Sequence, residues 1–103
     1  MIRTDGNPRN GIVHVIGAGM AGLGAAVHAA ALGHDVRVWE VAGQAGGRCR
    51  SFYDTVLDRL IDNGNHLILG GNHGVFRYLS DIGAEGALTP LTPAVFPFFE
   101  LPS

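Results

Sequence analysis

The sequence predicts an α/β fold that is built on one strand–helix–strand unit and runs on into the start of a second domain. A β-branched run, a run of small apolar residues and an alternating run follow one another within residues 11–40. A strand, a helix and a strand within about 30 residues form a βαβ unit with parallel strands and a right-handed crossover. The 103 residues are 47% hydrophobic and 16% charged, which is typical of a folded domain and not of a disordered chain.

The first half of the chain is expected to fold in this order. Residues 1–10 are polar and predict a flexible, frayed lead. Residues 11–16 are mainly β-branched and predict a buried strand. Residues 20–32 are almost all Ala, Leu, Val and Gly and predict a helix that lies close to a sheet, with Gly33 as its C-terminal cap. Residues 35–40 alternate and predict the second strand.

The second half is expected to begin with two short strands at 57–61 and 66–69, on either side of a turn at 62–65. An amphipathic helix is predicted over 72–82, and Gly83 is expected to end it.

From residue 84 onward prolines exclude a regular helix. The apolar stretch Phe96–Leu101 is expected to be extended, and core packing is favoured over an apolar substrate wall for its phenylalanines. Two strands and one helix cannot cover both faces of a parallel sheet. We therefore expect a fragment, or one piece of an assembled enzyme; the alternative is a compact small domain that ends here. The expected division is a lead at 1–10, an α/β segment at 11–66, and at 67–103 the start of a second region in a truncated chain.

Composition excludes several classes of function. A net charge of −2 gives no basic footprint for nucleic acid. There is no apolar run of about 18 residues, and residues 1–10 lack the apolar core of a signal peptide. The single Cys49 excludes an internal disulfide, and the histidines show no metal-ligand spacing. We expect a cytoplasmic protein without a metal.

A G-x-G-x-x-G pattern joins the first predicted strand to the predicted helix, and its residues are Gly17, Ala18, Gly19, Met20, Ala21 and Gly22. Gly17 permits a tight turn, Gly19 lets a pyrophosphate approach the backbone, and Gly22 lets the helix pack closely on the strand. The helix N-terminus then offers free N–H groups to the phosphates. The pattern and its context predict part of a Rossmann-like domain for FAD or NAD(P). The alternative is a glycine turn that binds no ligand.

Glu40 ends the second predicted strand, about 20 residues after the glycine pattern. A carboxylate there can accept hydrogen bonds from both ribose hydroxyls, and it would repel a 2′-phosphate, so NADP is disfavoured. The alternative is an exposed glutamate at a strand end.

A second glycine-rich segment favours FAD over NAD. Gly46, Gly47 and Arg48 follow Glu40 closely, in a loop for which a plain NAD site has no evident need. Two glycines would let the loop lie against the cofactor, and a guanidinium matches phosphate geometry. A flexible surface loop is the alternative.

Taken together, these motifs resemble the amine oxidase and phytoene desaturase superfamily of flavoproteins. The resemblance covers residues 11–66 and implies that they are a Rossmann-type FAD-binding segment, and that residues 67–103 begin a substrate or cap region. Residues 42–51 and 61–66 are similar to its squalene-associated branch, the FAD-dependent hydroxysqualene dehydroxylases. The resemblance implies that Gly17, Gly19 and Gly22 face the pyrophosphate of FAD, that Glu40 takes the adenosine ribose, and that Arg48 meets the phosphates.

The resemblance also implies that the turn at 62–66 lies near the flavin, which adds Gly64, Asn65 and His66 to the cofactor-binding residues. His66 is either a polar group beside the flavin or a structural histidine. No side chain forms a convincing acid–base pair, so no catalytic residue is assigned.

The function that the resemblance implies is the removal of the hydroxyl of hydroxysqualene by a reduced flavin, which gives squalene for isoprenoid and hopanoid synthesis. The implied substrate is an apolar isoprenoid, and peripheral membrane contact is expected from that lipid alone. Family members are several times longer, so this chain alone is expected to be inactive. The alternatives are carotenoid desaturation, amine oxidation, or a non-catalytic FAD-binding subunit that needs a partner chain.

Overall fold

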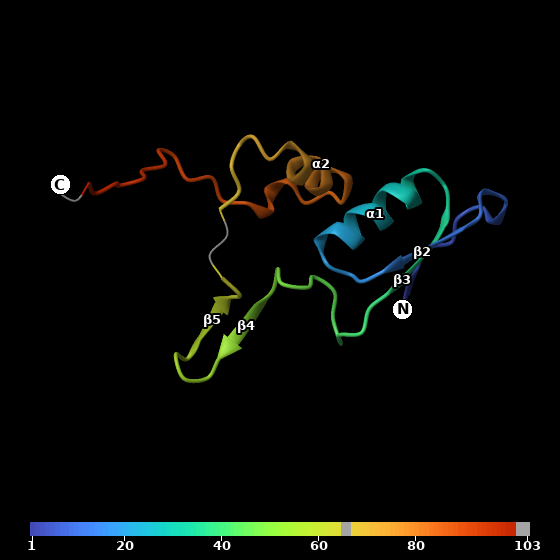
Figure 1. Ribbon diagram of the computed structural model, residues 1–103, viewed down its shortest axis with the longest axis horizontal. Helices are drawn as coiled ribbons and strands as arrows, with labels where there is room; N and C mark the ends of the chain where they lie inside the picture. Colours follow the sequence, from blue (N-terminus) through green and yellow to red (C-terminus); the bar gives the residue numbers. More distant parts are fainter. Residues whose placement is uncertain (65–66, 101–103) are drawn as a thin grey trace.

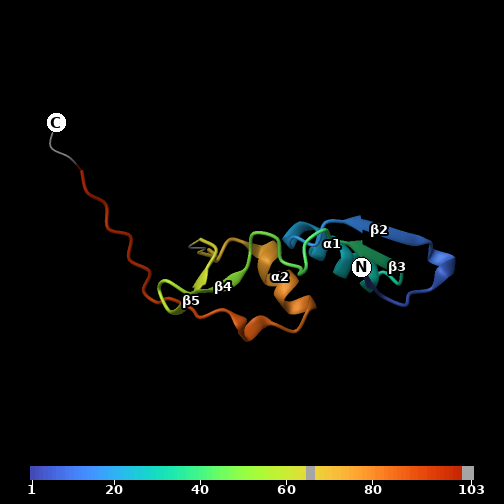
Figure 2. The ribbon, with the colours of Figure 1, turned by 90° about the horizontal axis from the view of Figure 1, so that it is seen from below.

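The computed structural model describes residues 1–64 and 67–100 and is elongated (Figure 1). An α/β part (residues 1–40) is followed by a β-hairpin (residues 51–62) and by a C-terminal part (residues 67–100). The molecule measures 65 × 35 × 30 Å, and its radius of gyration is 18.2 Å. A compact domain of this length has a radius of gyration of about 13 Å. Seen from below, the α/β part lies at one end and the extended C-terminal segment at the other (Figure 2).

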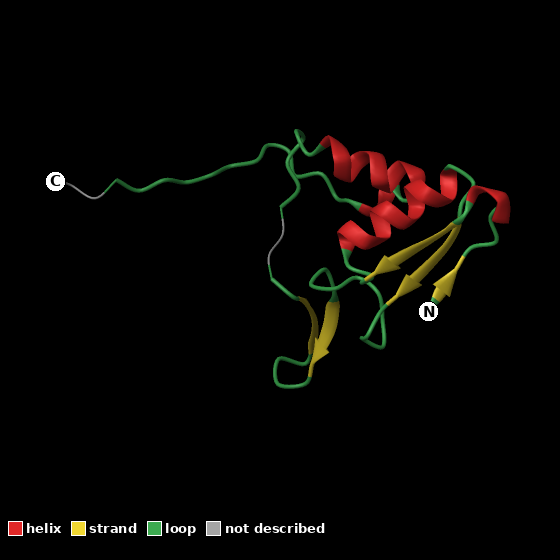
Figure 3. Cartoon of the chain, turned by 45° about the vertical axis from the view of Figure 1, so that its right-hand side comes forward, coloured by secondary structure: helices red, strands yellow, loops and turns green. Residues whose placement is uncertain are grey.

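The predicted βαβ unit is confirmed. Strands β2 (Ile12–Ile16) and β3 (Asp35–Trp39) are parallel and paired from Ile12 opposite Asp35 to Ile16 opposite Trp39. Helix α1 (Met20–Ala31) connects them and lies on one face of the sheet (Figure 3). The mixed helix and strand content agrees with the predicted fold class.

The core lies between α1 and the sheet. Its fully buried apolar residues are Ala18, Val36 and Val38. The side chains packed against them are Val13, Val15, Leu23, Ala26, Ala29 and Ala30. Since α1 contributes mainly alanines, the helix can approach the sheet closely, as the sequence predicted. On the opposite face, Trp39 donates its Nε1–H to Nδ1 of His14 at 2.9 Å, and its side chain is about half exposed.

Residues 1–10 differ from the expected frayed lead. Strand β1 (Ile2–Arg3) pairs antiparallel with β3, which places β3 in the centre of a three-stranded sheet. The N–H of Asn7 also donates to the carbonyl of Gly33 at 3.0 Å, before the short 3₁₀ helix η1 (Pro8–Asn10). The free edge of β3 offers unpaired backbone groups, and the N-terminal residues satisfy them.

The predicted strand at 57–61 is present in shifted form, but its expected partner is wrong. Strand β5 (Arg59–Asp62) pairs antiparallel with β4 (Ser51–Asp54), which precedes it. Residues 67–69 form no strand, and His66 lies outside the described residues. The turn falls at 55–58, because Oδ1 of Asp54 accepts the N–H groups of the two residues Val56 and Leu57, both at 2.9 Å.

The predicted second helix is confirmed as α2 (His73–Asp81), and Gly83 ends it with a φ of 68°. The N–H of Ala84 donates to the carbonyl of Leu79 at 2.7 Å, which completes this helix end. A short 3₁₀ helix, η2 (Glu85–Ala87), follows. Within the described residues, no helix is long and apolar enough to span a membrane.

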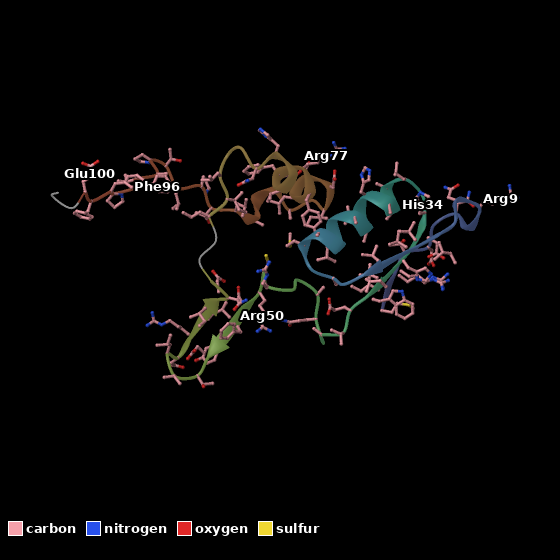
Figure 4. All side chains as sticks on the ribbon, viewed as in Figure 1. Arg9, His34, Arg50, Arg77, Phe96 and Glu100 are labelled. Carbon is pink, nitrogen blue, oxygen red and sulfur yellow. The ribbon has the colours of Figure 1, made fainter. Side chains whose placement is uncertain are left out.

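The described residues after η2 form no helix or strand and run outward as an extended segment (Figure 4). Core packing of the phenylalanines is not found, since Phe98 is 89% and Phe99 93% exposed. The last described residues extend away from the folded part of the chain (Figure 1), which leaves these two rings in solvent.

Candidate cofactor site

The glycine turn between β2 and α1 has the conformation that the sequence predicted. Gly17 has a φ of 95°, a left-handed value that favours glycine. Its N–H donates to the carbonyl of Trp39 at 2.7 Å, so the turn is fixed to the end of β3. Gly19 follows as the N-cap of α1.

Gly22 brings helix and turn into direct backbone contact. A Cβ atom at this position would lie 2.0 Å from the carbonyl oxygen of Gly17 and 3.4 Å from the side chain of Val15. Any side chain would therefore force the first turn of α1 away from β2. The close packing that the sequence predicted for Gly22 is confirmed.

The N-terminus of α1 is open to an anion. Gly19 offers no capping side chain, and the first turn carries no acidic residue. A Cβ atom at Gly17 or at Gly19 would meet nothing within 4 Å, so the space above the turn is free on this side. The first backbone N–H groups of the helix, beginning at Met20 and Ala21, have no partner within a helix. Free N–H groups, the positive end of the helix dipole and open space fit a diphosphate.

Glu40 joins the glycine turn to the loop that follows β3. Its Oε2 accepts the N–H of Ala18 at 2.7 Å, and its Oε1 accepts the N–H of Ala42 at 2.8 Å. The hydrogen bond from the backbone of Ala42 is the main cause that holds the pKa of Glu40 below its ordinary value, and the bond from Ala18 is the second cause. A carboxylate oxygen accepts more than one hydrogen bond, so the ionised group retains lone pairs for ribose hydroxyls. The sequence gives no signal for the hydrogen bond from Ala42 to Glu40, because the donor is a backbone N–H group.

The second glycine pair packs on the first. Gly46 has a φ of 114°, and its N–H donates to the carbonyl of Ala18 at 2.8 Å. Gly47 has a φ of 60°, and a Cβ atom there would lie 3.2 Å from Cα of Gly19. Loop packing therefore accounts for both glycines, and their contact with a cofactor stays a prediction.

Arg48 follows these glycines directly and is exposed. Among the described residues its guanidinium forms no ion pair or hydrogen bond, which leaves its charge available to an anion. Its carbonyl accepts Nδ2–H of Asn63 at 3.0 Å and the N–H of Arg50 at 3.1 Å.

Gly64 lies in the turn after β5, with a φ of 98°. The N–H of the preceding Asn63 donates to the carbonyl of Arg50 at 2.9 Å, so this turn lies beside residues 48–50. Asn65 and His66 lie outside the described residues. The structure thus brings the glycine turn, Glu40 and the segment before Arg48 together and attaches the Gly64 turn to that segment. Asn63 was not among the predicted site residues, although an asparagine directly after a strand is a usable signal.

A separate apolar groove of about 670 Å³ lies between residues 67–69, α2 and residues 85–96. Its lining includes Leu67, Ile68, Phe76, Leu88, Leu91 and Phe96. Glu85 is its one charged lining residue, so the groove suits an apolar ligand better than a nucleotide.

Comparison with known proteins identifies relatives of this chain. It is 51% identical over 94 residues to the hydroxysqualene dehydroxylase of Sinorhizobium fredii, which covers 91% of this chain and 22% of that protein. It is 50% identical over 91 residues to the hydroxysqualene dehydroxylase of Rhodopseudomonas palustris, covering 88% of this chain and 22% of the relative. Zeta-carotene desaturase of Solanum lycopersicum is 38% identical over 73 residues, covering 71% of this chain and 12% of that protein.

The chain spans about a fifth of the length of the hydroxysqualene dehydroxylases that it matches. The sequence profile of the flavin containing amine oxidoreductases matches residues 20–100, from the start of α1 to the end of the extended segment. The chain therefore belongs to the flavin containing amine oxidoreductase family, and a flavin is the cofactor that this family implies.

Proposed function

We propose that this chain binds the ADP half of FAD as the nucleotide-binding part of an oxidoreductase. The observation that carries the proposal is the convergence of an uncapped helix N-terminus, a glycine turn with open space above it, and an ionised Glu40 on one edge of the sheet. These features match the diphosphate and the ribose of one dinucleotide.

Each part of the site has a distinct task in the proposal. The first N–H groups of α1 donate to the pyrophosphate, and Glu40 accepts hydrogen bonds from the ribose hydroxyls. Arg48 places its guanidinium beside the phosphates. Gly64, Asn65 and His66 are proposed to face the flavin end.

For the complete enzyme we propose the dehydroxylation of hydroxysqualene. The carbon–oxygen bond of hydroxysqualene breaks, the hydroxyl takes one proton and leaves as water, and the carbon gains a hydride, which gives squalene. When bound, the reduced flavin supplies the two electrons and is oxidised. Identities of 51% and 50% to hydroxysqualene dehydroxylases support this reaction. The apolar groove beside α2 supports a long apolar substrate, and the proposal includes peripheral contact with the membrane that dissolves such a lipid.

Two other functions have some support. Carotenoid desaturation is favoured by the zeta-carotene desaturase relatives, at a lower identity of 38%. A non-catalytic FAD-binding subunit is favoured by the largely exposed apolar side chains of the C-terminal part, which a partner chain would cover.

FAD binding tests the first part of the proposal. The chain is titrated with FAD by flavin fluorescence quenching, with AMP and NAD as competitors. We expect saturable binding that AMP displaces. Glu40→Arg should abolish binding because it replaces the ribose acceptor by a cation, and Arg48→Ala should weaken binding. The matched controls are Glu100→Arg on the extended segment and Arg77→Ala on α2 (Figure 4). Unchanged FAD affinity in both site variants would show that the assigned site is wrong.

Product analysis tests the reaction. The full-length protein is incubated without oxygen with hydroxysqualene and reduced FAD, and squalene is measured by mass spectrometry. Parallel incubations contain zeta-carotene with oxidised FAD, or an amine with oxidised FAD and oxygen. Squalene formation supports the dehydroxylase. Turnover of either alternative substrate without squalene formation assigns the chain to that other reaction.

A further inference from the structure

Asn63 connects the β4–β5 hairpin to the segment that carries Arg48. It follows β5 directly, and its side chain reaches across to residues 48–50. Nδ2–H donates to the carbonyl of Arg48 at 3.0 Å, and the backbone N–H donates to the carbonyl of Arg50 at 2.9 Å. Figure 4 shows Arg50 at this junction, between the loop after β3 and the hairpin.

Apart from Asn63, the hydrogen bonds that hold the Arg48 segment are local: the N–H of Cys49 donates to the carbonyl of Gly46, and the N–H of Arg50 donates to the carbonyl of Arg48, both at 3.1 Å. The two residues before Arg48 are glycines with left-handed φ values, and glycine backbones are conformationally permissive. On the side of these two glycines, the loop is anchored by the hydrogen bond from the N–H of Gly46 to the carbonyl of Ala18. On the far side, Asn63 is the anchor that comes from outside the loop, and it shares the Arg48 carbonyl with the N–H of Arg50. Arg48 therefore lies between one attachment to the glycine turn and one attachment to the hairpin.

We propose that Asn63 is a positioning residue that holds the Arg48 backbone so that its guanidinium meets the cofactor phosphates. The inference rests on the proposed function, since it takes Arg48 as a phosphate contact. An amide side chain suits this task because it donates to a carbonyl and carries no charge. An aspartate has the same shape but no donor, and it would place a negative oxygen against the carbonyl of Arg48 and attract the guanidinium away from the phosphates.

FAD titration of Asn63 variants tests the proposal. Asn63→Ala should lower FAD affinity about fivefold, which corresponds to the loss of one hydrogen bond, and Asn63→Asp should lower it more. Arg48→Ala should lower affinity about tenfold or more, because charge-assisted bonds are lost. The double variant should bind no more weakly than Arg48→Ala alone, since Asn63 acts through Arg48.

Asn10→Ala is the matched control. Asn10 also donates Nδ2–H to a backbone carbonyl, that of Gly33 at 3.2 Å, but at the opposite end of α1. It should leave FAD affinity unchanged. Added salt should weaken binding to the wild type and to Asn10→Ala, and it should weaken binding less in both Asn63 variants, because the guanidinium–phosphate contact is the part that salt screens.

The outcomes separate the two proposals. If Arg48→Ala binds FAD like the wild type, the phosphate contact is wrong, and the role of Asn63 is overturned with it. If Arg48→Ala binds weakly while both Asn63 variants bind normally, only the role of Asn63 is overturned. The proposal is also overturned if Asn63→Ala lowers FAD affinity by the same factor in the wild type and in Arg48→Ala, with unchanged salt dependence. That result would show that Asn63 supports the hairpin and does not act through Arg48.

Discussion

The α/β part (residues 1–40) and the described residues from 41 to 100 differ in how much apolar surface they bury. All four buried residues of the described chain belong to the α/β part, and they are Ala18, Asp35, Val36 and Val38. Among the described residues from 41 to 100 none is buried. Side chains there such as Leu60 and Leu91 remain more than 60% exposed.

The difference follows from what each element can pack against. Helix α1 covers one face of a three-stranded sheet, which is enough to exclude water from Val36 and Val38. The hairpin has only two strands, and two strands by themselves are marginally stable. Elements β4, β5 and α2 therefore form without burying a core of their own, because a core needs two packed layers. The candidate cofactor-binding residues on the glycine turn lie on the part that has those two layers.

The largest expected effect tests the contact that closes the α/β part. Gly22→Ala should lower the free energy of unfolding by about 3 kcal/mol and abolish FAD binding, because its Cβ would overlap the carbonyl of Gly17. Gly24→Ala in the same helix is the control. Its Cβ would lie 3.9 Å from the Tyr78 ring, so helix propensity should stabilise the chain by about 0.5 to 1 kcal/mol. Urea unfolding measures both, and equal stabilities would refute the close packing.

The second-largest effect compares the truncation of a valine in the α/β part with the truncation of a valine in the hairpin. Val36→Ala should cost about 2 kcal/mol, because Val36 is only 1% exposed and its truncation leaves a cavity. Val56→Ala removes the same atoms from a side chain that is 91% exposed in the hairpin turn, and it should change stability by less than about 0.5 kcal/mol. Thermal unfolding of both variants measures the contrast. If Val56→Ala lowered the stability more than Val36→Ala, the α/β part would not be the part that holds the core.

A smaller effect should depend on pH. The folded-state pKa of Glu40 lies below its ordinary value of 4.5, so its hydrogen bonds stabilise the fold fully above that pH. This stability is lost as the pH falls through the lowered pKa, where the carboxylate is protonated in the folded state as well. Glu40→Gln should therefore be less stable than the wild type at neutral pH, with the gap narrowing in strong acid. Urea unfolding across this range measures the gap, and a constant difference would contradict the assignment.

The smallest effect is expected in the extended segment. Phe99→Ser should change the free energy of unfolding by less than about 0.5 kcal/mol, because the ring is 93% exposed. Calorimetry of this variant beside the wild type checks the expectation. A loss above about 1 kcal/mol would mean that the segment packs on the folded part.

Much of the fold and part of the candidate site were predictable because their signals are local. The βαβ unit, the conformation of Gly17, the close contact of Gly22 and the glycine that ends α2 all follow from residues within one turn or one element of each other. The position of Glu40 at the end of a strand was equally readable. Cofactor contacts for these residues, and for Arg48, Gly64, Asn65 and His66, stay predictions.

The sequence by itself therefore determined the α/β class, the glycine turn and the place of Glu40. Only the tertiary structure decided that residues 2–3 pair with β3, that β5 pairs with β4, and that Asn63 reaches Arg48. The physical reason is that propensity and periodicity act over a few neighbouring residues. A strand pairing or a side-chain bond to a distant carbonyl depends instead on which free backbone groups the folded chain brings within reach.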